Sequence, residues 1–461
     1  MRTSIASRLR PGRAALLLLI AAALVAGAWW TPTAHDFAKV ATGFGAKQLC
    51  SGVFVSGRQP DQVLASDMVD MPAIVRTSVD RDARSAFARI GPVHREARFR
   101  EGLGCSLVID AHDANALPDP PAADDASPTP LPEADVNDSR RLRLAPLVSA
   151  AFGEPDDDMQ RGTRAVVILH RGELVAEDYA PGFDADTPLP GWSMAKSVVH
   201  ALTGILLAED TVALDDGVPG WSETDDHRSD ITLRHLLQMT PGLTFDEDYT
   251  SPLGDPIRML FGEPSAPGFV RGKPMAHPPG DGWDYTSGTT NLLVWVLREA
   301  VDDDTRWATL PRDALFKPLG MRSAVMETDA EGNFVGSSFM YATARDWARF
   351  GLLYLQDGQW QSEQLLPEGW VDFAREPAPH APDGGYGAHF WLNRGDPDTG
   401  ERPWPALPPD TYAASGYQGQ EVVIVPSADL VVVRLGVSRP REAWDREWFV
   451  AGALEILDRL D

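Results

Sequence analysis

The sequence predicts an α+β protein, an α/β sandwich in which helices flank an antiparallel sheet and further helices form an all-helical subdomain. Two observations lead to this prediction. Strand-like segments occur over residues 164–179 and again over residues 387–435, whereas the sequence between them has the spacing of amphipathic helices. The simplest arrangement builds one antiparallel sheet from both ends of a large domain, with a mostly helical insertion between them.

Changes in composition divide the chain into four parts. Residues 1–30 are a predicted signal peptide or membrane anchor, residues 36–110 a small N-terminal module, residues 111–142 a linker rich in Pro, Ala and Asp, and residues 143–461 a large domain. The linker has almost no large apolar residue and therefore cannot build a core. The last part has an ordinary apolar content and is long enough to form one large domain.

The N-terminus has the pattern of a segment that directs export. Basic residues between Arg2 and Arg13 precede an uncharged, mostly apolar run over residues 14–30. Ala26-Gly27-Ala28 would suit cleavage by a signal peptidase, whereas Trp29-Trp30 would suit an anchor retained at a membrane interface. Both alternatives predict an exported protein, periplasmic or extracellular, and the second predicts a tether to the inner membrane.

The only two cysteines, Cys50 and Cys105, are expected to form a disulfide in an oxidising compartment. A catalytic cysteine is the alternative, although neither residue lies in a recognisable nucleophile motif. The bridge would join residues 49–55 to residues 104–108, and both segments are predicted to be short strands. No group of Cys and His residues has zinc-ligand spacing, so no metal site is expected.

Acidic residues outnumber basic ones by 67 to 41, which gives a formal net charge of −26. This balance argues against nucleic acid and against anionic membrane surfaces as partners. The acidic residues fall mostly in short runs, such as Asp302-Asp303-Asp304, that are typical of solvated loops. A small molecule is the expected partner, and the sequence does not define an oligomeric state.

Within the large domain the predicted elements follow in a simple order. A β-hairpin comes first, with strands over residues 164–170 and 173–179 on either side of Arg171-Gly172. Apolar spacing and capping residues then predict four helices, over residues 193–208, 231–239, 291–301 and 343–355. Strands are predicted over residues 387–392, 421–425 and 430–435, before a last helix over residues 445–460.

The segment Ser193-Met194-Ala195-Lys196 carries the strongest chemical signal. A helix that begins at Ser193 places the serine and lysine side chains on one face, about one turn apart. A serine hydroxyl becomes an effective nucleophile when a neighbouring base takes its proton, and a lysine near a helix N-terminus can become that base. The apolar residues from Val198 to Leu202 predict that this helix is buried and carries the pair into the interior.

Four motifs together resemble the superfamily of serine β-lactamases and penicillin-binding proteins, in its class C-like esterase and 6-aminohexanoate-dimer hydrolase branch. The motifs are Ser193-Met194-Ala195-Lys196, the segment from Ile231 to Leu243, Pro279-Gly280 followed by Tyr285-Thr286-Ser287-Gly288, and Gly416-Tyr417-Gln418-Gly419-Gln420. Their order and spacing match over roughly residues 160–460. The resemblance implies a β-lactamase/transpeptidase-like fold and a reaction that needs no cofactor.

The resemblance also implies roles for individual residues. Ser193 would be the acylated nucleophile, and Lys196 and Tyr285 would share the proton transfers, with either the lysine or a tyrosine phenolate as the base in acylation. The backbone N–H groups of Ser193 and Gln420 would form the oxyanion hole. Ser287 would hydrogen-bond Lys196 or the substrate. Further substrate contacts would come from Tyr417, Gln418 and Gly419.

Two histidines could suggest a Ser-His-Asp triad, but we expect both to be structural. His200 lies two turns from Ser193, about 10 Å along the helix axis, which is too far for direct proton transfer. His235 lies on a helix that packs against the core in the family. Ser193 is also not surrounded by the Gly-x-Ser-x-Gly pattern of α/β-hydrolases.

One departure from the family pattern bears on the substrate. Tyr417 occupies the place of the lysine that holds a substrate carboxylate in β-lactam-hydrolysing and peptidoglycan-processing relatives. We therefore expect a serine hydrolase that cleaves a carboxylic ester or small amide. The alternatives are a D,D-peptidase, a weak β-lactamase, or a catalytically silent relative that binds the cell wall. Tyr249 lies in a loop resembling the one whose tyrosine closes over the substrate in the aminohexanoate-dimer branch; a solvated acidic loop is the alternative.

Overall fold

The computed structural model describes residues 31–109, 117–121, 130–155, 158–222, 224 and 226–460. The predicted signal peptide or anchor therefore lies outside the described residues. Within these stretches, no helix combines the length and the apolar character needed to cross a membrane.

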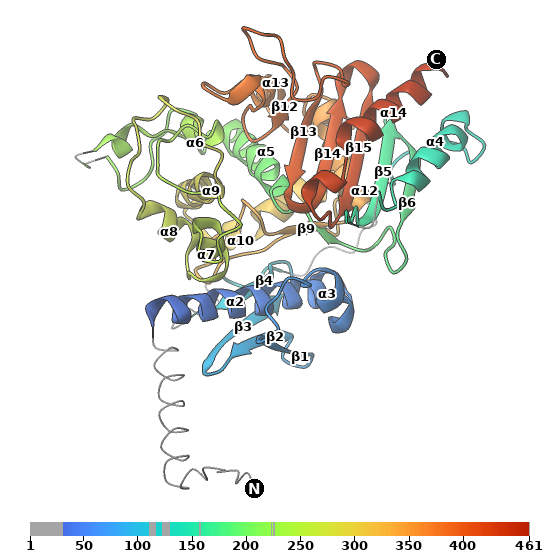
Figure 1. Ribbon diagram of the computed structural model, residues 1–461. Coiled ribbons are helices and arrows are strands. Elements are labelled where there is room, and N and C mark those ends of the chain that lie inside the picture. The colour runs from blue at the N-terminus through green and yellow to red at the C-terminus, as the bar shows by residue number, and fades with distance from the viewer. Residues whose placement is uncertain are drawn as a thin grey trace, which may run out of the picture.

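The large domain is built on a six-stranded sheet in the order β12-β13-β14-β15-β5-β6, with every neighbouring pair antiparallel (Figure 1). The strands span Trp391–Leu392, Tyr412–Gly416, Gln420–Val425, Leu430–Gly436, Thr163–His170 and Glu173–Tyr179 in that order. The predicted hairpin forms β5 and β6, and it pairs with β15 from the C-terminal part. The prediction of an α+β fold with one sheet built from both ends of the domain is confirmed.

Alternate residues of these strands face two separate cores. Val167 and Leu169 of β5 pack with helices α5 (Met194–Ala208) and α12 (Ala344–Leu355). Val166 and Ile168 point to the opposite face, where α4 (Ser139–Ala150) and α14 (Arg446–Asp458) pack. Because side chains alternate along a strand, a sheet covered by helices on both faces needs apolar residues at every position.

Helices beside the sheet form the predicted helical subdomain, at the left of Figure 1. They are α6 (Leu233–Leu237), α7 (Asp255–Phe261), α8 (Ala266–Arg271), α9 (Ser287–Val301) and α10 (Asp304–Leu310). Shorter elements connect them to the sheet: β7 (Leu189–Pro190), β8 (Val325–Met326), β9 (Met340–Ala342), β10 (Gln359–Trp360), β11 (Glu363–Gln364), α11 (Lys317–Leu319) and α13 (Trp370–Arg375), with helical turns over His227–Asp230, Pro311–Phe316, Pro382–Gly384, Tyr417–Gly419, Pro426–Ala428 and Arg441–Ala443.

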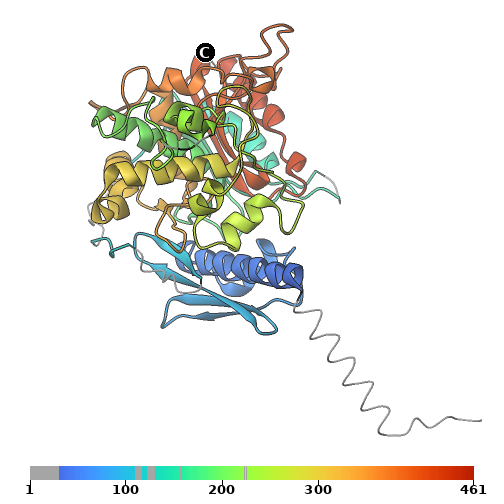
Figure 2. The ribbon, with the colours of Figure 1, turned by 90° about the vertical axis from the view of Figure 1, so that its left-hand side faces the viewer.

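The N-terminal module packs α2 (Pro32–Cys50) on an antiparallel sheet of β1 (Arg76–Asp80), β2 (Ser85–Ile90), β3 (Val93–Arg100) and β4 (Gly104–Val108), with the short α3 (Pro60–Ser66) alongside. Figure 2 shows α2 lying between this sheet and the large domain. Cys50 and Cys105 form a disulfide, as expected.

The predicted strand over residues 49–55 is wrong. Cys50 is the last residue of α2, and the π-helical turn Ser51–Val55 continues the helical path. The buried residues Ala46, Leu49, Cys50 and Val53 follow helical spacing, so the burial of one helix face determines the conformation here. The β-branched residues of this short segment suggested a strand, but tertiary packing overrides that local preference.

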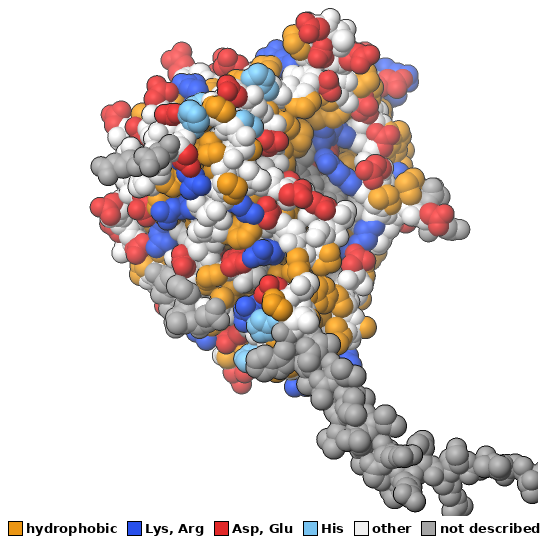
Figure 3. Space-filling view, turned by 60° about the vertical axis from the view of Figure 1, so that its left-hand side comes forward, with side chains coloured by type: hydrophobic (Ala, Val, Ile, Leu, Met, Phe, Trp, Pro, Cys, Tyr) orange, Lys and Arg blue, Asp and Glu red, His pale blue; other side chains and the backbone are white. Residues whose placement is uncertain are grey.

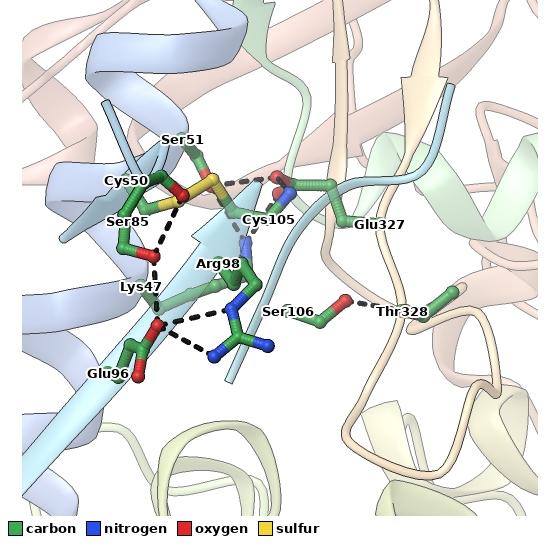
Figure 4. Close-up of a disulfide and its surroundings, with 11 residues drawn as sticks. Lys47, Cys50, Ser51, Ser85, Glu96, Arg98, Cys105, Ser106, Glu327 and Thr328 are labelled. Atoms are coloured by element: carbon green, nitrogen blue, oxygen red, sulfur yellow. Dashed lines mark hydrogen bonds and ion pairs between the residues drawn. A yellow bond between two sulfur atoms is a disulfide. The ribbon is translucent and has the colours of Figure 1, made fainter. Parts of the chain in front are cut away.

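A buried ion pair joins the module to the large domain beside the disulfide (Figure 4). Lys47 Nζ lies 2.5 Å from a carboxylate oxygen of Glu327, and the two side chains are 2% and 0% exposed. The same carboxylate accepts hydrogen bonds from the Ser51 hydroxyl at 2.8 Å and from the Cys105 backbone N–H at 2.7 Å. A second contact pairs Arg164 of β5 with Asp67, which also binds Arg58.

Part of the expected linker also packs against the large domain. Ala134 N donates to Leu174 O at 3.1 Å, and Leu174 N donates to Pro132 O at 2.7 Å. Leu131 and Ala134 are buried. Over these residues the chain is an added edge of the sheet rather than a free spacer.

Acidic side chains do not gather into one patch on the face shown in Figure 3, where they are interspersed with basic and apolar ones. Of the acidic runs, Asp302-Asp303-Asp304 is exposed, as predicted for solvated residues.

Candidate active site

Ser193 lies at the N-terminus of α5, where the chain turns sharply out of β7. Trp192 adopts a left-handed backbone with φ 48°, an uncommon conformation for a bulky residue. The turn leaves Ser193 half-buried, while Lys196, one helical turn later, is only 1% exposed. The buried apolar face of α5 thus holds the lysine inside the protein and the serine at the surface of the core.

The Lys196 ammonium position has three neighbours at hydrogen-bonding distance. Nζ lies 3.1 Å from Ser193 Oγ, 3.1 Å from Ser287 Oγ and 3.0 Å from the carbonyl oxygen of Ser337. The structure therefore brings together the serine and lysine of the first motif with the serine of the third. A lysine held by three partners has one orientation, which is the preorganisation that a proton-transfer group needs.

Tyr285 lies at the same site. Lys196 Nζ is 5.0 Å from the centre of its ring, and the ring packs against Tyr386 and Trp391 at centroid distances of 5.6 Å and 5.1 Å. The aromatic cluster fixes the ring beside the lysine. Its predicted share of the proton transfers stays a prediction.

Glu247 belongs to this site and was not singled out from the sequence. Its carboxylate accepts hydrogen bonds from the Ser287 backbone N–H at 2.8 Å, from the Ser287 hydroxyl at 2.5 Å and from the Tyr249 hydroxyl at 2.9 Å. Tyr249 Oη also lies 3.2 Å from Ser287 Oγ. Burial, reinforced by the neighbouring carboxylate, raises the pKa of Tyr249 well above its usual value, so its phenol is neutral at pH 7. Glu247 and Tyr249 therefore belong to the site, whereas Asp246 of the same loop is exposed.

Aromatic side chains lie at the exposed edge of the site, which we call its mouth. The ring of Tyr417 is 51% exposed, stacks on Tyr249 at 5.8 Å and meets Trp192 edge-on at 5.8 Å. The predicted substrate contacts Tyr249 and Tyr417 thus lie side by side next to the residue that precedes Ser193. Gln418 and Gly419 continue the same turn, with φ 61° and 78°.

The strand geometry bears on the oxyanion hole. A Cβ added at Gly416 would lie 3.2 Å from Ser193 N and 2.2 Å from Gly191 O, so the end of β13 lies directly against the start of α5. Asn393 N donates to Thr411 O, so odd-numbered residues of this strand direct their backbone groups away from β14. By this alternation the backbone N–H of Tyr417 points away from β14 and is not used in the β13–β14 pairing.

Gln420, the predicted second backbone donor of the oxyanion hole, is less favourably placed than Tyr417. It is the ladder partner of Gly416 in the β13–β14 pairing, so its N–H faces the neighbouring strand. Its side chain is also committed, because Nε2 donates to Tyr417 O at 2.9 Å and Oε1 accepts from Gly436 N at 2.9 Å. The structure therefore favours Tyr417 as the second backbone donor, with Gln420 holding the turn in shape.

Arg434 provides no cation at the mouth of the site. It is fully buried on β15, and its guanidinium donates to the backbone carbonyls of Gln418 at 2.9 Å and Gly419 at 2.8 Å. Burial lowers the pKa of this guanidinium to about 9. Arg434 supports the turn of the fourth motif from behind and is not available to a substrate carboxylate.

The histidines make structural contacts, in keeping with the expectation. His200 is fully buried, with Nδ1 2.7 Å from Tyr354 Oη and its ring stacked on Trp370 at 4.6 Å. Burial lowers its pKa to about 3, so it is neutral at pH 7. His235 Nδ1 lies 3.0 Å from the Thr232 hydroxyl at the start of α6. No three His, Cys, Asp or Glu side chains among the described residues are grouped so as to hold a metal ion.

Comparison with known proteins gives concordant matches. The family model described as Beta-lactamase matches residues 148–453. The 6-aminohexanoate-dimer hydrolase of Paenarthrobacter ureafaciens is 23% identical over 307 residues, which cover 59% of this chain and 72% of that protein. A putative β-lactamase from Bacteroides dorei DSM 17855 has a similar structure, with a TM-score of 0.55, 18% identity and coverage of 68% of this chain and 98% of that one. EstCE1, a hydrolase with promiscuous acyltransferase activity, gives a TM-score of 0.53 at 16% identity, over 69% and 98% of the two chains.

Proposed function

The chain belongs to the beta-lactamase family of hydrolases, and we propose that it is an exported serine hydrolase that forms an acyl-enzyme on Ser193 and cleaves a carboxylic ester or small amide. The observation that carries this proposal is the approach of Ser193 Oγ to Lys196 Nζ at 3.1 Å, with the lysine buried and held by two further partners. A hydroxyl beside a buried amine has the arrangement of an activated nucleophile.

In the proposed reaction Ser193 Oγ attacks the carbonyl carbon while its proton passes to Lys196 Nζ or to the Tyr285 oxygen. The resulting oxyanion would accept hydrogen bonds from the backbone N–H groups of Ser193 and Tyr417. Collapse of the intermediate expels an alcohol or amine, which takes up the transferred proton. Water then attacks the acyl-enzyme by the same route in reverse, giving a carboxylic acid and free Ser193.

The charges around the site support an ester or small amide, rather than a β-lactam, as the substrate. Tyr417 stands at the mouth where the family's β-lactam-hydrolysing members have lysine, and Arg434 is bound to backbone carbonyls. The rim is formed instead by the rings of Trp192, Tyr249 and Tyr417. Such a rim suits an uncharged or apolar acyl group better than a carboxylate. The 6-aminohexanoate-dimer hydrolase among the similar proteins supports a small amide as the substrate.

The test combines an active-site label with three substrate classes. The full chain is incubated with a fluorophosphonate probe, a series of p-nitrophenyl esters, linear aminohexanoyl amides and nitrocefin. Ser193→Ala is compared with Ser229→Ala, which alters an exposed serine. We expect labelling and ester or amide turnover in the native chain and in Ser229→Ala, and neither in Ser193→Ala.

Other outcomes are equally informative. Absence of both labelling and turnover in the native chain would overturn the enzymatic proposal and favour a silent cell-wall-binding relative. Nitrocefin turnover equal to or faster than ester turnover would overturn the substrate ranking and favour a β-lactamase or D,D-peptidase. Export is tested separately by cell fractionation, with the Cys50–Cys105 disulfide as a marker of an oxidising compartment.

A further inference from the structure

Glu247 accepts hydrogen bonds from both donors of Ser287 and from the hydroxyl of Tyr249. It accepts from the Ser287 N–H at 2.8 Å, the Ser287 O–H at 2.5 Å and the Tyr249 O–H at 2.9 Å. A carboxylate is an acceptor only, so the direction of these three bonds is fixed. The Ser287 hydroxyl hydrogen therefore points toward Glu247 and its oxygen lone pairs point elsewhere.

This direction determines how Lys196 can bond. The Ser337 carbonyl, 3.0 Å from Nζ, can only accept. Ser287 Oγ, 3.1 Å away, must also accept, because its hydrogen is committed to Glu247. Two N–H bonds of Lys196 are thus assigned, and a neutral amine has only two. The remaining position of Nζ, its lone pair in the neutral form, is the one that faces Ser193 Oγ at 3.1 Å.

We propose that Glu247 is a positioning residue of this hydrolase: by fixing the Ser287 hydroxyl as an acceptor, it directs the Lys196 lone pair to the proton of Ser193. The inference rests on the proposed function, since it assigns a role to Glu247 in acylation of Ser193. Glu247 itself contacts neither the nucleophile nor Lys196 directly. It acts through one oxygen atom, Ser287 Oγ, which is hydrogen-bonded to both Glu247 and Lys196.

Replacement of Glu247 by Gln disturbs this arrangement in either orientation of the amide. Glu247 uses Oε1 for the two hydroxyls and Oε2 for the Ser287 N–H. If the amide NH₂ takes the first place, it drives the Ser287 hydroxyl to turn toward Lys196 and compete with Ser193 for the lone pair. If the NH₂ takes the second place, two donors face each other and the loop must move.

The titratable groups around Lys196 differ in charge. The groups that face Lys196 are Tyr285, His389 and, through Ser287, Glu247 and Tyr249. Burial lowers the pKa of His389 well below its usual value, so this histidine is neutral at pH 7, as is Tyr249. Glu247 is therefore the carboxylate among these groups, and it reaches Lys196 through Ser287 Oγ.

The experiment compares Glu247→Gln with Asp246→Asn, which removes the same charge from the neighbouring, exposed position of the loop. For Glu247→Gln we expect kcat on a p-nitrophenyl ester to fall about tenfold or more, within the usual contribution of a general base. The rate of fluorophosphonate labelling of Ser193 should fall by a similar factor, because the same proton transfer activates the serine. For Asp246→Asn we expect no change in either quantity.

A Ser287→Ala background separates this role from a merely structural one. If Glu247 acts through the Ser287 hydroxyl, Glu247→Gln should lower kcat much less when Ser287 is already alanine, so the two effects are not additive. Full additivity would overturn the proposal. So would a Glu247→Gln variant whose kcat and labelling rate equal those of Asp246→Asn. A thermal melt verifies folding. If Glu247→Gln does not fold, Glu247→Asp serves instead: it keeps the carboxylate but shortens its reach to Ser287, so kcat should still fall.

Failure of this inference is distinguishable from failure of the proposed function. The proposed function fails when the native chain is neither labelled nor active. The inference fails when the native chain is active, Ser193→Ala is not, and Glu247→Gln behaves like its control.

Discussion

Replacement of Glu327 by Gln tests how strongly the N-terminal module is bound to the large domain. The Glu327 side chain is fully buried and accepts hydrogen bonds from Lys47 Nζ at 2.5 Å, Ser51 Oγ at 2.8 Å and Cys105 N at 2.7 Å. Gln has nearly the same size, so the change removes a charge without opening a cavity. Lys47, only 2% exposed, would be left as a buried ammonium without a counter-charge.

Loss of one partner of a buried ion pair typically costs about 3–5 kcal/mol of unfolding free energy, and we expect a value in this range at pH 7. The loss should shrink as the pH rises. Burial lowers the pKa of Lys47 and the Glu327 carboxylate opposes this shift, so the pKa falls further in the variant. The unfolded lysine keeps a pKa of about 10.4. Between the lowered pKa of the folded variant and this value, the folded variant binds fewer protons than its unfolded form. Its unfolding free energy therefore rises with pH relative to that of the native chain.

Urea unfolding followed by tryptophan fluorescence and far-UV circular dichroism, at pH 7 and pH 9 with the disulfide intact, measures both effects. Glu101→Gln is the matched control, because Glu101 pairs with Arg84 on the surface with exposures of 75% and 47%. Its cost should stay below about 1 kcal/mol. Adding Lys47→Met to Glu327→Gln removes the unpaired charge and should recover most of the loss. A Glu327→Gln variant that matches the surface control at both pH values would refute the reasoning.

Three further predictions concern other parts of the molecule. Cys50→Ser should lower the unfolding free energy by about 4 kcal/mol, the chain-entropy value for a closed loop of 55 residues, and an unchanged urea midpoint would contradict this. Burial raises the pKa of Asp329 to about 6. The protonated side chain therefore contributes its full stability below about pH 4, and this contribution is lost as the pH rises through 6. Urea unfolding should show that the unfolding free energy of the native chain falls by about 3 kcal/mol over this interval relative to that of Asp329→Asn. Gly416→Ala places a Cβ 2.2 Å from Gly191 O, so the burst rate with a p-nitrophenyl ester should fall about 10²-fold, more than the thermal midpoint accounts for; an unaffected burst would contradict the close packing of β13 on α5.

The elements predicted correctly are those whose burial shows in their own sequence. The hairpin of β5 and β6 and the helices α5, α12 and α14 have apolar residues at the spacing of their buried faces. The errors lie where backbone conformation changes inside an apolar segment. The predicted strand over residues 387–392 is reduced to β12, because His389 adopts φ 58°, and the predicted helix over residues 231–239 ends as α6, because Met239 adopts φ 61°.

Strand β13 was missed for a different reason. Its sequence, Tyr412-Ala413-Ala414-Ser415-Gly416, contains no β-branched residue and ends in glycine, so its strand propensity is weak. The small residues are required by position, because Gly416 lies against Gly191 and the start of α5. The small residues that this close packing requires have weak strand propensity, so the sequence alone does not predict the strand.

The site shows the same division between local and tertiary information. Ser193 and Lys196 are one helical turn apart, so their spacing in the sequence already predicts their proximity. Glu247 contacts Ser287 across 40 residues and lies in the stretch Asp246-Glu247-Asp248, which has the composition of a solvated loop. Only the fold distinguishes the half-buried, hydrogen-bonded carboxylate of Glu247 from its exposed neighbour Asp246.

The N-terminal module lies outside the matched family region, yet its ion pair supports the same scaffold that holds Lys196. Glu327 N donates to Phe339 O and Glu327 O accepts from Val335 N, both at 2.9 Å, so the backbone of Glu327 brackets Ser337. The carbonyl of Ser337 is one of the two fixed acceptors of the Lys196 amine. Lys47 therefore anchors, through Glu327, the turn whose Ser337 carbonyl orients the predicted base, and Glu327→Gln should be assayed for turnover at temperatures where it is fully folded. A module that served only as a spacer would not need a buried charge at this position, since an apolar contact of similar size is typically as stable.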